Sequence, residues 1–323
     1  MRKHSQINIR SPLLLTLCAL IWGMAFVAQR AGMDFIGPFL FMGIRMLLGS
    51  VTMLIVIVIQ GFLRPIPAID RQVQQPQLTN AQKKMDIRRL MKAGAFCGLV
   101  LFFGGSLQQV GLVFTTASKA GFLTALYLVL VPIFGIVLKH KTHWNTWASV
   151  LIAMVGLYFL CITDGFSIEF GDLITLCGAL FWAGHILVID HFVTGLSQRD
   201  VMKLCAAQFM VASVLGFISS AFLDRLFING VFETAAIIGA LPSILYVGIL
   251  STGVAFTLQA MGQQGISPSA ASIIMSLEAV FSVVGGMLIL GEVLSGQEVF
   301  GCVLMFSAFI LSQLPIGQSK QPI

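Results

Sequence analysis

Three ionisable side chains, Arg45, His185 and Glu278, occur inside long apolar stretches of this 323-residue chain. Ionisable groups within a membrane-spanning helix are costly, so they normally face a cavity or another helix. Glu278 lies about ten residues into its stretch, which places it ~15 Å along a helix and near the middle of a bilayer. A carboxyl group there could gain and lose a proton and so couple to a proton gradient. Alternatively, it could be a neutral structural group held by hydrogen bonds.

Arg45 and His185 are further candidates for a binding site. Arg45 could bind a carboxylate through two parallel hydrogen bonds, or it could cap helix carbonyls or pair with a nearby acid. His185 could bind a solute or relay protons, because imidazole titrates near neutral pH. The alternative for His185 is a hydrogen-bond donor between two helices, and the sequence leaves each of these choices open.

Neutral polar and aromatic residues in similar stretches could complete the site. Gln108 and Gln259 offer neutral hydrogen-bonding groups, and Trp22, Trp182 and Tyr127 could form apolar walls. Ordinary packing explains such aromatic residues equally well. These five residues join the three ionisable ones as candidate substrate and coupling residues, and we expect no catalytic residue.

The overall composition suits lipid rather than water as the solvent. Hydrophobic residues make up 57% of the chain and charged residues 10%, with a mean hydropathy of +0.95. A soluble domain carries roughly 25% charged residues, so this chain is too poor in charge to cover a water-facing surface.

Ten segments are apolar enough to form spanning helices, since a helical span needs about 20 mostly apolar residues. They are 12–29, 37–60, 91–113, 118–138, 144–163, 170–190, 201–223, 235–258, 268–290 and 296–315. We therefore predict an all-α integral membrane protein with ten transmembrane helices. The segment 61–90 holds three prolines and a basic cluster, and it is predicted to be a mobile polar loop.

Lysine and arginine residues are distributed unequally between the two predicted sides. With the N-terminus inside, fifteen fall on the cytoplasmic side, and only Arg30, Lys119 and Arg225 fall on the outer side. This bias predicts that the N- and C-termini are both cytoplasmic. It also accounts for the formal charge of +6, so no nucleic-acid partner is expected.

The two halves of the chain resemble each other. Five residues of the first half return at a constant offset of 151 positions, and Trp22 has a counterpart in Trp182. The five pairs are Leu107 with Leu258, Gln108 with Gln259, Gly111 with Gly262, Ser118 with Ser269, and Ala120 with Ala271. Order and offset together indicate an internal repeat.

The repeat has a consequence for topology. Because each half contains five predicted spans, the second copy must enter the membrane from the opposite side. We predict two inverted five-helix repeats, 12–163 and 170–315. The same offset aligns Tyr127 with Glu278, so the candidate site is asymmetric, and it aligns Lys141 with Glu292.

Short motifs in both halves resemble the EamA-like family of the drug/metabolite transporter superfamily. In the second half the motifs are Ser267-Pro268-Ser269-Ala270-Ala271, Leu277-Glu278-Ala279-Val280 and Leu290-Gly291-Glu292, followed by Gln297 and Gly301. In the first half they are Trp22-Gly23, Arg45, Thr115-Thr116-Ala117-Ser118, Phe122-Leu123-Thr124 and Val131-Pro132, and Gly171-Asp172 opens the second copy. The resemblance covers residues 12–315.

This resemblance implies ten spans and the proton-coupled or gradient-driven movement of amino acids, other metabolites or drugs, often outward. The chain departs from the family pattern at two places. It has Lys139-His140-Lys141 where many members carry a Gly-Glu pair, and Ala279 where Pro often follows Glu. The resemblance therefore indicates the family and not a subfamily or a substrate.

We therefore expect a multi-pass protein of the bacterial inner membrane that works as a secondary transporter. It would export a small organic solute, such as an amino acid or a drug-like compound, by alternating access. Its expected partners are that solute, the lipid bilayer and protons, and a homodimer is possible. The alternative is a non-transporting membrane assembly or sensory protein.

The sequence lacks the short motifs of several other activities. There is no GxxxxGK[ST] phosphate loop for ATP-driven transport and no HExxH or GxSxG motif for hydrolysis, so we do not expect an enzyme. The six cysteines have no CxxC or Cys/His spacing, and we expect no disulfide, metal site or cofactor.

Overall fold

Every regular element is a helix in the part of the chain that the computed structural model describes, namely residues 9–63, 80–139, 143–161, 168–227, 233–285 and 295–314. Apolar side chains dominate these residues, and a helix satisfies its backbone hydrogen bonds within one segment. In the first half the helices are α1 (Arg10–Gly23), α2 (Ala25–Met33), α3 (Pro38–Leu63), α4 (Asn80–Phe114), α5 (Ala117–Ala125), α6 (Tyr127–Val137) and α7 (Trp144–Cys161).

The second half is divided more finely. Its elements are α8 (Phe170–Val193), α9 (Gln198–Leu223), the 3-10 helix η2 (Asp224–Leu226), α10 (Thr234–Gly239), α11 (Leu241–Leu245), the π-helix η3 (Tyr246–Ala255), α12 (Phe256–Gln263), α13 (Pro268–Met275), α14 (Glu278–Gly285) and α15 (Gly296–Gln313).

Eight helical stretches in the described residues are long and apolar enough to cross a membrane. Two more apolar stretches, Trp144–Leu160 and Pro268–Val284, are shorter. Within the described residues, all ten predicted segments are mostly helical, which agrees with an all-α membrane protein, while the count of ten spans stays a prediction. Lys141 and Glu292, which the repeat aligns with each other, lie outside the described residues.

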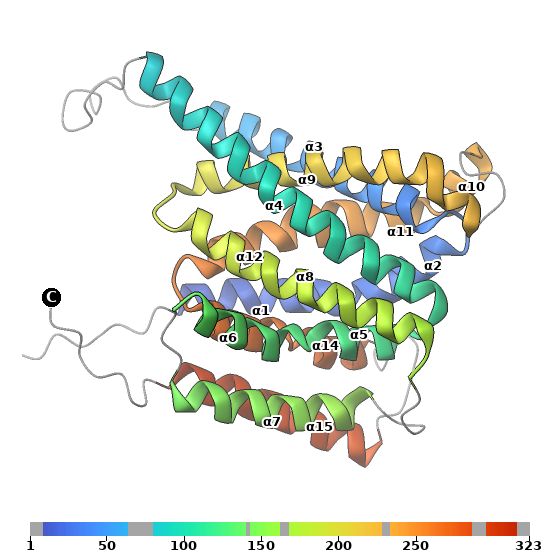
Figure 1. Cartoon of the computed structure of the whole chain (residues 1–323), viewed down its shortest axis with the longest axis vertical. Helices are drawn as coiled ribbons and strands as arrows, with labels where there is room; N and C mark the ends of the chain where they lie inside the picture. The colour runs from blue at the N-terminus through green and yellow to red at the C-terminus, as the bar shows by residue number, and fades with distance from the viewer. Residues whose placement is uncertain are drawn as a thin grey trace, which may run out of the picture.

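The helices lie side by side and run alternately in opposite directions between two ends of a bundle (Figure 1). We call the left end of the view the α3–α4 end, because α3 ends and α4 begins there. We call the right end the α2–α3 end, because α2 ends and α3 begins there. Helix α3 packs against α9, α4 packs against α8 and α9, and α7 and α15 form a pair at the lower margin of the bundle. Elements from both halves therefore meet along most of the bundle.

The predicted loop 61–90 is partly wrong. Helix α3 continues to Leu63 and α4 begins at Asn80, so residues 80–90 are helical rather than loop; residues 64–79 lie outside the described part. The sequence of 80–90 is rich in Ala, Gln, Lys, Arg and Met, all of which have high helix propensity. The resulting helix α4 projects beyond its neighbours at the α3–α4 end (Figure 1).

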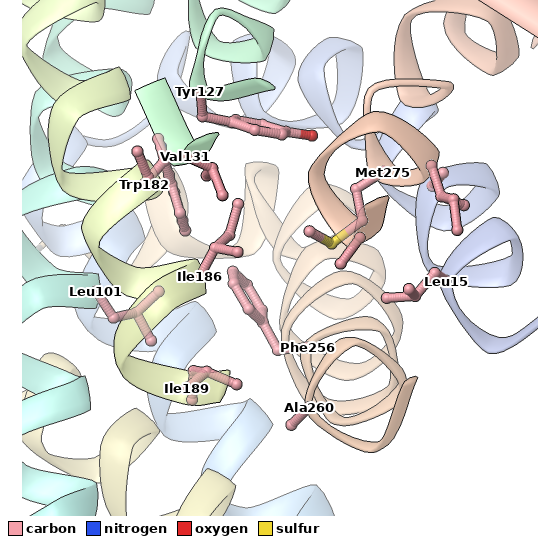
Figure 2. Packing of buried hydrophobic residues seen from close by; sticks show 14 of the residues in the cluster. Leu15, Leu101, Tyr127, Val131, Trp182, Ile186, Ile189, Phe256, Ala260 and Met275 are labelled. Carbon is pink, nitrogen blue, oxygen red and sulfur yellow. The ribbon is translucent and has the colours of Figure 1, made fainter. Parts of the chain in front are cut away.

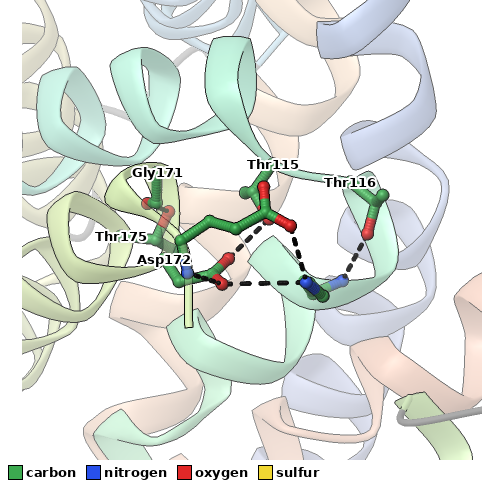
Figure 3. Close-up of polar contacts among 7 residues, drawn as sticks. Thr115, Thr116, Gly171, Asp172 and Thr175 are labelled. Atoms are coloured by element: carbon green, nitrogen blue, oxygen red, sulfur yellow. Dashed lines mark hydrogen bonds and ion pairs between the residues drawn. The ribbon is translucent and has the colours of Figure 1, made fainter. Parts of the chain in front are cut away.

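A hydrogen-bonded network at the α2–α3 end fixes the start of α8 (Figure 3). The Thr115 hydroxyl, at the α4–α5 junction, donates to Asp172 Oδ1, and the backbone N–H of Glu169 donates to Asp172 Oδ2. Lys119 Nζ lies 3.3 Å from Glu169 Oε1 and 3.8 Å from Asp172 Oδ2. Carboxylates at a helix N-terminus satisfy backbone donors and complement the helix dipole. The first half of the chain thereby sets the position of α8.

Four spans have irregular backbone in the middle of the bundle. Helix α1 gives way to α2 at Met24, and η3 is a ten-residue π-helix. The other two breaks correspond at the repeat offset: α5 ends before Leu126, and α13 ends before Ser276 and Leu277. At each of these, a backbone N–H bonds three residues back, Leu126 to Leu123 (3.3 Å) and Leu277 to Ile274 (3.1 Å). Breaks at equivalent positions of two halves mark binding sites in membrane transporters.

Buried side chains from several helices surround the centre of the bundle. Leu15 of α1, Tyr127 of α6, Ile186 of α8 and Phe256 of α12 are all at most 5% exposed. Figure 2 shows Phe256 lying beneath Trp182 and Ile186, with Tyr127 above them. Side chains from both halves thus enclose the centre of the bundle.

Helix α3 is held in place by two contacts with α9 and its C-terminal extension. The backbone N–H groups of Phe39 and Leu40 donate to the carboxylate of buried Asp224 at 3.0 and 2.7 Å, which caps the start of α3. Farther along, a Cβ added at Gly216 would lie 2.8 Å from Gly43 Cα, so the two helix backbones touch there. Small residues allow this close approach in membrane bundles.

The substitution Gly216→Ala should therefore destabilise the folded protein by about 1–3 kcal/mol, because the new methyl group meets backbone atoms. Gly184→Ala is the matched control, since the nearest neighbour of its Cβ would be Val100 Cγ1 at 3.8 Å. Thermal unfolding in detergent, followed by loss of the monodisperse chromatographic peak, measures both. Equal melting temperatures for the two variants would contradict the close approach of α3 and α9.

Candidate functional site

A cavity of about 490 Å³, counting the space at its opening, lies at the centre of the bundle. It is bounded by α1 to α6, α8, η3, α12 and α14. The residues that line it are Trp22, Ala25, Phe26, Gln29, Arg45, Gln108, Thr124, Tyr127, Trp182, Ile186, Ser251, Phe256, Gln259 and Glu278. Seven of the eight candidates from the sequence are among them; His185 is not.

Glu278 and Tyr127, which the repeat aligns, meet directly in the cavity. The Tyr127 hydroxyl donates a hydrogen bond to Glu278 Oε1 at 3.2 Å. Each is the first residue after its helix break, and their exposed fractions are 3% for Tyr127 and 4% for Glu278. The two equivalent breaks thus bring an acid and a phenol together at the interface of the halves.

Arg45 presents a buried guanidinium to the same cavity. Its Nη1 donates to Gln29 Oε1 at 2.8 Å, and Nε and Nη2 lie 3.3 and 3.1 Å from Met42 Sδ. No described carboxylate oxygen lies within 4.0 Å of its nitrogens. A thioether is only a weak acceptor, so the guanidinium keeps donor capacity for an anionic or polar ligand.

Three aromatic rings form one wall of the cavity. The rings of Trp22 and Phe256 meet edge to face with centroids 4.8 Å apart, and those of Trp182 and Phe256 stack at 5.8 Å. Trp22 Nε1 donates to the carbonyl of Ser251 in η3 at 3.1 Å. This bond fixes the indole against the π-helix, and the ring faces offer an apolar surface to a bound molecule.

Three cavity-lining side chains have a buried polar atom without a hydrogen-bond partner among the described residues: Thr124 Oγ1, Trp182 Nε1 and Gln259 Oε1. Leaving a buried donor or acceptor unmade costs about 1–3 kcal/mol. One donor, one acceptor and one hydroxyl are thus available to a polar ligand. The arrangement can bind a molecule that has both charged and apolar parts.

His185 lies behind the aromatic wall and not in the cavity. It is fully buried, its Nε2 lies 3.0 Å from Gln208 Oε1, and its ring packs 5.9 Å from that of Phe256. The sequence left open an interhelical role for His185, and the contact joins α8 to α9. His185 lies outside the cavity because of the rotation of α8 about its own axis. Sequence patterns do not give that rotation to within one residue.

Several lining residues were not anticipated, among them Gln29, Thr124, Ser251 and Phe256. Gln29 carried a usable signal, because it is a polar residue in the first predicted span and lies about two helical turns after Trp22. Ser251 and Phe256 had none, because their positions depend on the π-helix. Within the described residues, no group of three His, Cys, Asp or Glu side chains could hold a metal ion.

Comparison with known proteins places the fold and the site in context. The model of the EamA-like transporter family matches residues 10–162 and again residues 169–313. A solved crystal structure that is 16% identical superimposes with a TM-score of 0.70, covering 94% of this chain and 96% of that one. At that identity the likeness concerns the fold alone.

Curated relatives carry transporter names. An "Uncharacterized transporter" of Archaeoglobus fulgidus is 31% identical over 303 residues, 94% of this chain and 85% of the relative. The "Uncharacterized transporter YoaV" of Bacillus subtilis is 23% identical, covering 93% of this chain and 96% of the relative. The "Uncharacterized transporter YwfM" of the same organism is 24% identical and covers 96% of both chains.

The Arg45–Gln29 contact yields a direct test of the cavity's electrostatics. The substitution Gln29→Leu removes the oxygen acceptor of a buried guanidinium and should destabilise the protein by about 1.5–3 kcal/mol. Gln29→Glu keeps an acceptor and adds a complementary charge, so its stability should match or exceed that of the wild type. Thermal unfolding in detergent compares the variants, and an unchanged melting temperature for Gln29→Leu would rule out the contact.

Proposed function

This chain belongs to the EamA-like transporter family, and from that premise we propose that it is a secondary transporter of a small organic solute that carries a carboxylate and an amino group. The observation that supports this most strongly is the central cavity, which brings Arg45 and Glu278 together with an aromatic wall. Amino acids have the matching pattern of charges.

The solute's carboxylate binds at Arg45. A guanidinium forms two parallel hydrogen bonds with a carboxylate. The hydrogen bond from Arg45 Nη1 to Gln29 Oε1 holds the guanidinium in position. Gln108 and Gln259, which the repeat aligns, add neutral hydrogen bonds to the solute. Its apolar part lies against Trp22, Trp182 and Phe256, so an aromatic or aliphatic side chain is favoured over a charged one.

Glu278 exchanges a proton for the solute's ammonium group. In the absence of solute, the protonated carboxyl is compatible with an apolar surrounding, because burial disfavours an uncompensated charge. Binding of the ammonium group supplies a counter-charge and releases the proton. Tyr127 holds the carboxyl in position through its hydroxyl, so that solute and proton compete for one group and their movements in opposite directions are coupled.

The two halves, 12–163 and 170–315, act as inverted five-helix repeats in a ten-span protein whose termini face the cytoplasm. Support comes from the pairs Gln108 with Gln259 and Tyr127 with Glu278, whose members all line the cavity. Alternating access then consists of rocking one half against the other around this cavity. A proton gradient directed inward across a bacterial inner membrane would drive the solute outward.

Transport by the purified protein in liposomes tests this function. Wild type should accumulate at least one radiolabelled L-amino acid against its gradient when a proton gradient of opposite direction is imposed. Uptake of every proteinogenic L-amino acid at the rate of protein-free liposomes would exclude this substrate class. It would leave a non-transporting assembly or sensory protein as the alternative.

The substitution Glu278→Gln should abolish coupling. The variant should lose gradient-driven accumulation. It should keep solute exchange at equal pH through Arg45 and the aromatic wall, but with a higher half-saturating concentration because the counter-charge of the ammonium group is lost. Glu298→Gln is the matched control, since Glu298 is a half-buried capping residue at the start of α15 and does not line the cavity. Full accumulation by Glu278→Gln would contradict the coupling role.

The substitution Arg45→Gln should act on solute binding. Because it removes a charge-assisted contact worth about 1.5–3 kcal/mol, the half-saturating concentration for exchange should rise about 10-fold or more. The measurement is the concentration dependence of exchange at equal pH. An unchanged half-saturating concentration would show that the carboxylate binds elsewhere.

A further inference from the structure

A second cluster of buried polar side chains lies between the cavity and the α3–α4 end of the bundle. His185 of α8, Gln208 of α9 and Gln263 of α12 are at most 1% exposed. Each has a buried polar atom without a hydrogen-bond partner among the described residues: His185 Nδ1, Gln208 Nε2 and Gln263 Oε1. Three unmade hydrogen bonds in one region are expensive, and they point to a ligand rather than to a structural role.

An aromatic barrier separates this cluster from the cavity. The Phe256 ring lies 5.8 Å from Trp182, which lines the cavity, and 5.9 Å from His185, which does not. On its other flank it packs against Phe209 of α9, again at 5.9 Å. Phe256 therefore lies between the cavity, which it lines, and the polar cluster, whose His185 it contacts.

A hydrogen-bonded closure lies on the opposite side of the cluster, where α12 ends. Gln263 Nε2 donates to the carbonyl of Ile186 at 2.9 Å. The next residue, Gln264, donates to the carbonyls of Val193 and Leu196 at the α8–α9 turn, at 2.7 and 3.0 Å. The end of α12 is thereby fastened over the end of α8, and the cluster is sealed from both directions.

We propose that His185, Gln208 and Gln263 form a second binding site, which takes a neutral hydrogen-bonding group once Phe256 moves aside. The site offers amide and imidazole groups and has no described ion pair, so a hydroxyl, an amide or water matches its chemistry better than an ion. Resting on the proposed function, it is the next position on the solute's path from the cavity to the α3–α4 end. Water and the neutral part of the solute are the two sources of such a group.

A native cysteine allows a direct test that does not depend on transport. Cys205 is fully buried and lies one helical turn before Gln208 on α9. A protein that keeps Cys205 and has alanine at Cys18, Cys97, Cys161, Cys177 and Cys302 would report access to the cluster. The probe is a charged, membrane-impermeant methanethiosulfonate, applied to the protein in liposomes and followed by mass spectrometry.

In this background Phe256→Ala should raise the rate of Cys205 modification by about 10-fold or more, because the barrier between cavity and cluster is removed. Phe256→Leu, which keeps most of the volume, should stay near the parent rate. A second control places the cysteine at Ala153→Cys in a protein without Cys205. Ala153 is fully buried in α7, away from the cluster, so its rate reports general loosening of the bundle.

The outcomes separate the possibilities. If Cys205 reacts no faster in Phe256→Ala than in the parent, or no faster than the cysteine at position 153, the second site is overturned. Faster modification supports it whether or not amino-acid transport is found. A mixture of L-amino acids that then protects Cys205 assigns the site to the solute, whereas unchanged modification assigns it to water.

Discussion

Arg45 and Glu278 are both buried in the middle of an apolar bundle, and neither is neutralised by the other. No carboxylate oxygen in the described residues comes within 4.0 Å of the guanidinium. Each is held instead by a neutral partner, Gln29 for Arg45 and Tyr127 for Glu278. The desolvation cost of such groups is high. Both line one cavity, and in the function that we propose the solute's own charges complete the pairing.

Irregular backbone makes room for that cavity. A continuous helix offers no free backbone groups, whereas a break or a π-helix exposes some and re-aims the adjacent side chains. Glu278 and Tyr127 directly follow breaks at equivalent positions of the two halves, and Trp22 precedes the break at Met24. Two hydrogen bonds tie the break in the first span to η3: Trp22 to the Ser251 carbonyl and Tyr246 to the Ile21 carbonyl, at 3.1 and 2.8 Å. These reciprocal bonds join regions that would both have to change shape during transport.

Much of this arrangement could be predicted from the sequence, because the solvent dictates it. An apolar chain in lipid must be helical, and the few polar residues within its spans must face one another. The constant offset of 151 added the pairing of Gln108 with Gln259 and of Tyr127 with Glu278, and all four line the cavity. The resemblance to the EamA-like family is confirmed by a match over nearly the whole chain. Other features depended on tertiary context. The π-helix, the positions of Ser251 and Phe256, and the rotation that puts His185 behind Phe256 follow from packing between helices, which periodicity does not encode.

In the coupling that we propose, one carboxyl in the cavity, that of Glu278, binds either a proton or the solute. The most direct test is the proton movement that accompanies solute addition to liposomes containing the purified protein and a trapped pH-sensitive dye, with no gradient imposed. Addition of a transported amino acid outside should acidify the external medium and make the interior more alkaline in the wild type, with no such change in Glu278→Gln. Solute entry without proton movement in the wild type, or equal proton movement in both proteins, would contradict the account.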